Sequence, residues 1–268
     1  MNESILSKVQ YYFNQEKSLN NDKLLRLENI INNPQTPFRI IVFGKYNHGK
    51  STFLNSWLKQ NLFKTGDTRV TTEVQAHKDE ENNIIWVDTP GLDANIKDDE
   101  VAIYAIKEAD IVLLVHDAVA GELDIKELDF IKESSITAKG KIKLLLTKID
   151  QNEVNIFDIM RLIKNQVDDF NIKIFPVSPI RYQKYIDNQS AIWKAKSGFD
   201  ALYIEIKGSI SNRDLLRKQE AKGLCNDLIQ QLDTVKSEVL NDIKSFTQQI
   251  NTKQDVFNIA VQNILKHF

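Results

Sequence analysis

Residues 44–51 read GKYNHGKS, which has the spacing G-x-x-x-x-G-K-S, between an apolar run that ends at Phe43 and an amphipathic stretch. In this strand–loop–helix setting the pattern predicts a phosphate-binding loop. Glycines let the main chain wrap closely around phosphate, so that amides at the helix start point at anionic oxygens. Lys50 adds a positive charge at the outer phosphates, and Ser51 offers a hydroxyl to Mg²⁺. We expect the phosphates to contact Gly44, Lys45, Asn47, His48, Gly49, Lys50, Ser51 and Thr52.

Outward from this loop, short apolar runs alternate with amphipathic stretches. The runs fall at residues 39–43, 84–87, 111–115, 142–146 and 172–177, and the amphipathic stretches at 101–108, 122–132 and 156–166. Each run is almost continuously apolar, as expected for a strand that is buried on both faces of a mainly parallel sheet. The alternation therefore predicts an α/β fold with right-handed crossovers.

Two more motifs follow predicted strands. The first is DTPG at 88–91, where Asp88 can hold Mg²⁺ through water and the Gly91 amide can meet a γ-phosphate. The second is TKID at 147–150, where the Asp150 carboxylate can accept two hydrogen bonds from guanine. Adenine lacks that pair of donors, so a buried acid left unsatisfied would discriminate against it.

Three further residues complete the predicted base site. Thr147 begins the second motif, and the stem of Lys148 can lie against the plane of the base. Ser178 follows the last predicted strand and can bring an amide or a hydroxyl to the base carbonyl. Either tetrapeptide alone would be a weak signal, but their order and their places at strand ends indicate a guanine-nucleotide site.

Two terminal segments flank the α/β zone at residues 35–212. Residues 1–34 carry apolar side chains at helical spacing, and Pro34 and Pro37 end that pattern. Residues 213–268 contain no proline and no glycine after Gly223, and their apolar residues almost form a heptad seam. We expect one long helix that pairs with the N-terminal helix or with another chain, or that lies on the domain surface. A bend near 251–255 would suit the lack of apolar residues there.

Composition limits the class of protein. Among 268 residues, 35 basic and 37 acidic side chains give no global electrostatic reason to bind nucleic acid. The single cysteine, Cys225, excludes a disulfide framework and a Cys-based zinc site. No apolar run approaches the ~18 residues of a membrane span, and the first residues lack the apolar core of a signal peptide. The expectation is a cytoplasmic soluble protein without a transmembrane segment.

The motifs GKYNHGKS, VTTE at 70–73, DTPG, TKID and VSP at 177–179 resemble those of the translation-factor-related P-loop GTPases. Within that class the chain looks like the branch of dynamin-like, tRNA-modification and septin-type GTPases, and resembles a minimal bacterial dynamin-like GTPase. The resemblance covers about residues 38–212. It implies a Ras-like fold, GTP, GDP and Mg²⁺ binding, and slow GTP hydrolysis stimulated by dimerisation or a partner.

The resemblance also implies individual roles. Thr72, or alternatively Thr71, matches the switch threonine that ligates Mg²⁺ together with Ser51 and Asp88. Lys50, Thr72, Gly91 and Asn47 form the catalytic set. Asn47 matches an asparagine that ligates K⁺ in the tRNA-modification GTPases, and it can equally be a local hydrogen bonder.

Two other positions bear on hydrolysis. Leu92 stands where Ras-type enzymes carry the glutamine that orients the attacking water, so water must be positioned by other groups. Arg69 is a solvated loop residue or an arginine finger. His48 is expected to be structural, and His77, His116 and His267 show no metal spacing.

Dynamin-like relatives pack a helix before the GTPase domain against a long helix after it, which implies a neck that transmits the nucleotide state. Expected partners are a second GTPase domain or a related subunit joined through the helices, with a peripheral membrane link only through a partner. One alternative is a GTPase of ribosome or RNA assembly, yet residues 213–268 hold 8 basic and 7 acidic side chains, and residues 1–34 hold 4 of each. Neither end shows the basic cluster of an RNA-binding appendage. The other alternative is a GTP-gated scaffold with negligible hydrolysis.

Overall fold

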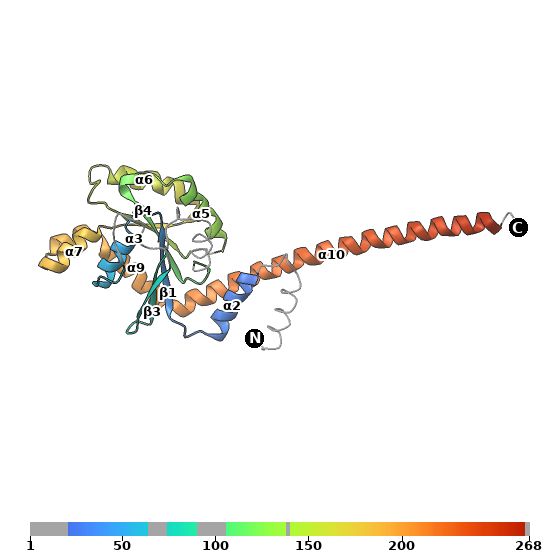
Figure 1. Ribbon diagram of the computed structural model, residues 1–268, viewed down its shortest axis with the longest axis horizontal. Coiled ribbons are helices and arrows are strands. Elements are labelled where there is room, and N and C mark those ends of the chain that lie inside the picture. Colours follow the sequence, from blue (N-terminus) through green and yellow to red (C-terminus); the bar gives the residue numbers. More distant parts are fainter. Residues whose placement is uncertain (1–20, 64–73, 90–105, 138–139, 266–268) are drawn as a thin grey trace. The chain divides into compact units, whose positions relative to one another are not determined.

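The computed structural model describes residues 21–63, 74–89, 106–137 and 140–265 (Figure 1). The chain forms two compact units. One spans Pro34–Arg217, and the other combines Met1–Asn33 with Lys218–Phe268. We call them the α/β unit and the helical unit.

The described part of the α/β unit contains a six-stranded sheet in the order β2-β3-β1-β4-β5-β6. The strands are β1 (Phe38–Gly44), β2 (Gln75–Asp79), β3 (Ile84–Asp88), β4 (Ile111–Asp117), β5 (Ile142–Thr147) and β6 (Lys173–Pro176). All neighbours pair in parallel except β2, which runs antiparallel to β3. This mixed, mainly parallel sheet confirms the predicted Ras-like α/β class.

Two apolar cores cover the two faces of the sheet, because successive strand residues point to opposite faces. On one face Ile41 and Leu114 pack with Ile131 of α5 (Ile125–Thr137) and Ile163 of α6 (Ile156–Val167). On the other face residues such as Val42 pack against α3 (Lys50–Leu58) and α9 (Phe199–Ser211). Figure 1 shows these two helical layers with the sheet between them. The layers hold the carboxyl ends of the parallel strands at one edge, where ligands of open α/β sheets bind.

Shorter elements complete the α/β unit. They are η1 (Ala118–Ala120), η2 (Asp168–Phe170), α7 (Pro179–Asn188) and α8 (Ala191–Ser197). Strand β2 does not coincide with any predicted run. Its sequence QAHKD is polar because it lies at the sheet edge, with half-buried and exposed side chains in alternation.

Helix α10 (Arg213–Leu265) begins in the α/β unit, and Arg217 near its start bonds to that unit. The guanidinium donates two hydrogen bonds to the Asp110 carboxylate, at 2.9 and 2.8 Å. It also donates to the backbone carbonyls of Pro34, Thr36 and Pro37 at 3.0 to 3.2 Å. Arg217 is 5% exposed and Asp110 is 8% exposed, so this charge pair is buried and densely hydrogen-bonded.

In the helical unit, α2 (Asn21–Asn32) packs on α10 through a small apolar cluster. Its buried members are Leu24, Leu27, Leu224 and Leu228. Arg26 donates to both carboxylate oxygens of Glu220, at 2.9 and 3.1 Å, and Lys23 lies 2.6 Å from Asp227. Beyond this cluster α10 continues without a break through residues 251–255. Its large apolar side chains from Val239 onward are exposed, and none of the described helices is long and apolar enough to cross a bilayer.

Candidate functional site

The loop of residues 44–51 joins β1 to α3 and begins with a glycine that no other residue can replace without strain. Gly44 has φ of +145°, and a Cβ atom there would come within 2.3 Å of the Val115 carbonyl oxygen. Gly49 precedes the first turn of α3 with φ of +90°, and its carbonyl accepts from the Phe53 amide at 2.9 Å. The loop therefore turns sharply into a helix N-terminus, the arrangement that binds phosphate through amide groups.

Lys50 is held inside this turn. Its ammonium group donates to the carbonyl oxygens of Gly44 at 3.0 Å and Lys45 at 2.9 Å. The residue is only 7% exposed, so its charge is held in position before any ligand binds. A fixed positive charge beside a helix N-terminus is suited to the outer phosphates of a nucleotide.

Ser51 and Asp88 lie next to Lys50, at the ends of α3 and β3 that face each other. The Ser51 hydroxyl donates to Asp88 Oδ2 at 2.7 Å, whereas Asp88 Oδ1 is buried without a hydrogen-bond partner among the described residues. Burial raises the pKa of Asp88, and the Ser51 hydrogen bond and the Lys50 charge oppose that shift. Mg²⁺ prefers hard oxygen ligands. The Asp88 carboxylate and the neighbouring Ser51 hydroxyl are such ligands, so this pair fits Mg²⁺.

On the other side of the loop, β5 ends in the TKID motif. The Thr147 hydroxyl contacts two carbonyl oxygens, those of His48 at 2.6 Å and His116 at 3.1 Å, and so ties the motif to the phosphate loop. Lys148 has φ of +55°, and its ammonium group lies 2.5 Å from Asp117 Oδ2. The lysine thus reaches from the end of β5 to the last residue of β4.

Asp150 and Ser178 also come together. The Ser178 hydroxyl donates to Asp150 Oδ1 at 2.5 Å, and its oxygen accepts from the Arg181 amide at 3.1 Å, which caps α7. Ser178 is fully buried. The serine thus holds the carboxylate in one orientation, which is the condition for selecting a base by hydrogen bonds.

The other predicted residues divide into two groups. Lys45 forms an ion pair with Asp124, Asn47 is exposed in a left-handed conformation with φ of +59°, and Thr52 is exposed in the first turn of α3. The switch and catalytic positions Thr71, Thr72 and Gly91, together with Arg69 and Leu92, lie outside the described residues. The roles assigned to the latter group stay predictions.

Sequence reasoning missed a layer of polar residues beneath the loop, formed by Asp117, Asp124, Glu127 and His116. Asp124 and Glu127 bond reciprocally at the start of α5: the Glu127 amide donates to Asp124 Oδ1 at 3.0 Å, and the Asp124 amide donates to Glu127 Oε2 at 3.1 Å. This is a capping box. The spacing D-x-x-E at 124–127 could have identified it.

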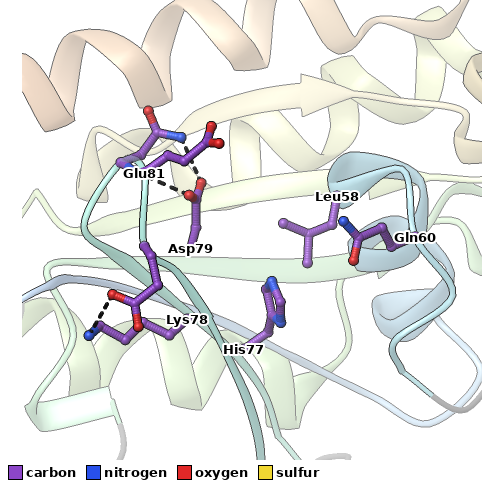
Figure 2. A pocket seen from close by; sticks show the side chains of 8 residues that line it. Leu58, Gln60, His77, Lys78, Asp79 and Glu81 are labelled. Carbon is purple, nitrogen blue, oxygen red and sulfur yellow. Dashed lines mark hydrogen bonds and ion pairs between the residues drawn. The ribbon is translucent and has the colours of Figure 1, made fainter.

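A separate pocket of about 330 Å³ lies between the end of α3 and the β2–β3 turn (Figure 2). Leu58, Gln60 and His77 face it, and acidic residues of the turn surround it. Its polar groups already bond to one another, because Asn82 donates to Asp79 at 2.7 Å and Lys78 pairs with Glu80 at 2.9 Å. The pocket is distinct from the phosphate loop, which lies at the opposite end of α3.

Residues 39–159 match the family described as 50S ribosome-binding GTPase. The chain is 34% identical over 238 residues to an uncharacterised protein of Acinetobacter baylyi, a match that covers 84% of this chain and 55% of the relative. It is 30% identical over 142 residues to GTPase Era of Borreliella afzelii, covering 49% of this chain and 48% of Era. The chain thus spans about half the length of the curated relatives that it matches.

Among solved structures, one from a study of an oligomerised bacterial dynamin pair that senses and tethers membranes matches with a TM-score of 0.58. The match covers 97% of this chain and 50% of the other, at 15% identity, so it shows a shared fold. The motif order, the six-stranded sheet and the family match over residues 39–159 lead to one conclusion: this chain contains a P-loop GTPase domain with a Ras-like fold.

Proposed function

We propose that this protein binds GTP with Mg²⁺ and hydrolyses it to GDP and phosphate. The main support is that three groups lie at the carboxyl ends of the parallel strands. Lys50 bonds to the loop carbonyls, Ser51 bonds to the buried Asp88, and Ser178 orients Asp150. These groups match the three parts of the substrate, namely its phosphates, its metal ion and its base.

In this proposal each residue acts by placement and charge. Lys50 would neutralise the β- and γ-phosphates, and Ser51 and Asp88 would hold Mg²⁺, Asp88 through water. The ion supplies positive charge to the phosphate oxygens. Water attacks the γ-phosphorus as the bond to the β-phosphate oxygen breaks, so catalysis requires mainly positioning. The Gly91 amide at the γ-phosphate and Thr72 as the second protein ligand of the ion belong to this proposal.

The base site gives the first test. Asp150→Asn is expected to lower GTP affinity about 100-fold, because each hydrogen bond to a charged group contributes about 1.5 kcal/mol or more and two are lost. Affinity for xanthosine triphosphate should rise, since xanthine offers a carbonyl where guanine has its amine. Titration calorimetry with both nucleotides measures the change.

The side-chain amide introduced by Asp150→Asn keeps an oxygen that can still accept from the Ser178 hydroxyl, so the local fold is preserved. Asp158→Asn, on the exposed face of α6, is the matched control and should bind GTP like the wild type. If Asp150→Asn keeps full selectivity for GTP, Asp150 does not contact the base.

We further propose that K⁺ and pairing of two GTPase domains stimulate hydrolysis, with Asn47 as the K⁺ ligand. Its side chain is exposed at the tip of the phosphate loop, where a monovalent ion could offset charge on the transferring phosphoryl group. Asn47→Gly removes the amide but tolerates the left-handed backbone. We expect the turnover of the wild type to be greater in KCl than in NaCl of equal ionic strength, and that of the variant to be equal in both salts.

Tyr46→Phe is the matched control, because it changes the neighbouring exposed position of the same loop and keeps Asn47. It should retain the difference between the two salts. A KCl effect of the same size in Asn47→Gly would remove the asparagine from the ion site.

For the rest of the chain we propose the organisation of residues 1–34 and 213–268 as a helical neck beside a GTPase domain at 35–212. Packing of α2 on α10 and the exposed apolar residues farther along α10 support a coiled-coil role in partner binding. Sizing the protein with GDP, with a non-hydrolysable GTP analogue and with GDP–aluminium fluoride tests whether pairing follows the nucleotide state. A size that is the same in all three states would contradict this proposal.

The second candidate is a role in ribosome or RNA assembly, which the family description and the Era relatives favour. Stimulation of turnover by ribosomal RNA at physiological salt would support it. RNA binding that is lost uniformly as salt rises, without any effect on turnover, would count against it.

A further inference from the structure

Beneath the phosphate loop, three side chains from different elements converge. His48 comes from the loop, His116 from β4 and Glu127 from the first turn of α5, and one ligand atom of each lies within 4.8 Å of the others. His116 is 1% exposed, Glu127 is fully buried, and His48 is 9% exposed at the rim. The group therefore lies in the interior, with His48 as its most exposed member.

The hydrogen bonds show which atoms face the centre. His116 Nε2 lies 3.0 Å from the Gly121 carbonyl oxygen, an acceptor, and therefore carries the hydrogen. This leaves Nδ1, which lies 2.8 Å from Glu127 Oε1. Both ring nitrogens of His116 therefore face oxygen atoms, and Nδ1 points at the Glu127 carboxylate.

Among the described residues, His48 is held through one ring nitrogen only. The Val115 backbone hydrogen-bonds its ring, while Nδ1 is buried without a hydrogen-bond partner in the part of the chain that the structure describes. Because the Val115 backbone takes the other ring nitrogen, Nδ1 is the atom left to present a lone pair. That atom lies 3.6 Å from Glu127 Oε1.

We propose that His48 Nδ1, His116 Nδ1 and Glu127 Oε1 form a binding site for a borderline divalent cation such as Zn²⁺. Two imidazole nitrogens and a carboxylate oxygen form a ligand set that zinc uses in proteins, with water in a remaining position. The backbone carbonyls that hold the Nε2 hydrogens are the outer partners that orient ligating histidines.

The ligand chemistry separates this site from the magnesium position at Ser51 and Asp88. Imidazole nitrogens favour zinc, cobalt and nickel over magnesium, which prefers oxygen. In a tetrahedral site, ligands at ~2.1 Å from zinc lie ~3.4 Å apart, so ligand atoms as far as 4.8 Å apart must approach each other by about 1 Å on binding. Contraction would draw His48 toward β4 and α5 and so stiffen the phosphate loop.

Equilibrium titration of the full chain with Zn²⁺ tests the proposal, without nucleotide and in excess Mg²⁺. A Cys225→Ser background removes the one thiol. One equivalent is expected to bind, and Co²⁺ in its place should give the visible bands of a four- or five-coordinate site. His48→Ala and Glu127→Gln should each weaken binding at least about 10-fold, since even the loss of an outer partner has that effect.

Control variants and a folding check make the titration decisive. His77→Ala removes a histidine elsewhere in the same unit and should bind Zn²⁺ like the wild type, and Glu127→Gln keeps an oxygen for the Asp124 amide. Melting in the presence of a chelator verifies that each variant is folded. Absence of saturable uptake, or equal affinity in His48→Ala and His77→Ala, would overturn the proposal. Because no nucleotide is present, the result is independent of GTPase activity.

Discussion

The Lys50→Ala variant is expected to bind GTP at least about 100-fold more weakly than the wild type. Charge-assisted hydrogen bonds from one ammonium group to phosphate contribute about 3 kcal/mol when two are formed, and 1.4 kcal/mol corresponds to a factor of ten. The residue is already aligned by the Gly44 and Lys45 carbonyls, so little of that energy is spent on ordering the side chain. Calorimetry or a fluorescent guanine nucleotide measures the loss.

Two further variants distinguish a loss of GTP binding from a loss of folding. Lys78→Ala removes an exposed lysine of β2 and should leave the affinity unchanged. Lys50→Met keeps the volume of the stem without the charge, so it should remain folded and still bind poorly. Retained micromolar affinity in a folded Lys50 variant would contradict the assignment of residues 44–51 as the phosphate loop.

The second large effect, on stability, is expected near the start of α10. Arg217→Ala should destabilise the α/β unit by about 3–5 kcal/mol, because it leaves the Asp110 carboxylate buried without its partner. Three backbone carbonyls between Pro34 and Pro37 lose their donor as well. For a domain of this size the melting temperature should fall by roughly 10 °C.

All three tryptophans, Trp57, Trp86 and Trp193, lie in the α/β unit, so fluorescence reports on its unfolding alone. Arg213→Ala, one turn earlier on the same helix, is the control and should change stability by less than about 0.5 kcal/mol. Equal melting of the two variants would show that the Arg217–Asp110 pair does not stabilise the fold.

Much of the α/β unit could be predicted from the sequence because its central strands are buried on both faces. Their apolar runs are long and distinct, and β4, for example, is buried throughout. Strand β2 was missed because an edge strand needs few apolar residues. The possible bend near 251–255 does not interrupt the helix: α10 continues through these residues, since a helix needs only its own backbone hydrogen bonds there, not apolar anchors.

The site residues that belong to contiguous sequence motifs could be predicted. Lys50, Ser51 and Asp88 meet as expected, and Asp150 meets Ser178, because parallel strands bring their carboxyl ends to one edge. His116 lies 68 residues after His48, and no spacing rule joins a loop to a neighbouring strand. Only the strand order places β4 next to β1 and brings these rings together.

The buried Asp88 oxygen that lacks a partner among the described residues has a consequence for how long each chain survives. The raised pKa of Asp88 means that the ionised group opposes folding at neutral pH when nothing compensates it. A cation that arrives with nucleotide, as proposed, would remove that penalty and favour the native over the unfolded state by mass action. Proteases that degrade briefly opened chains would then remove unloaded copies faster, and the cellular pool would become enriched in molecules that carry their ligand.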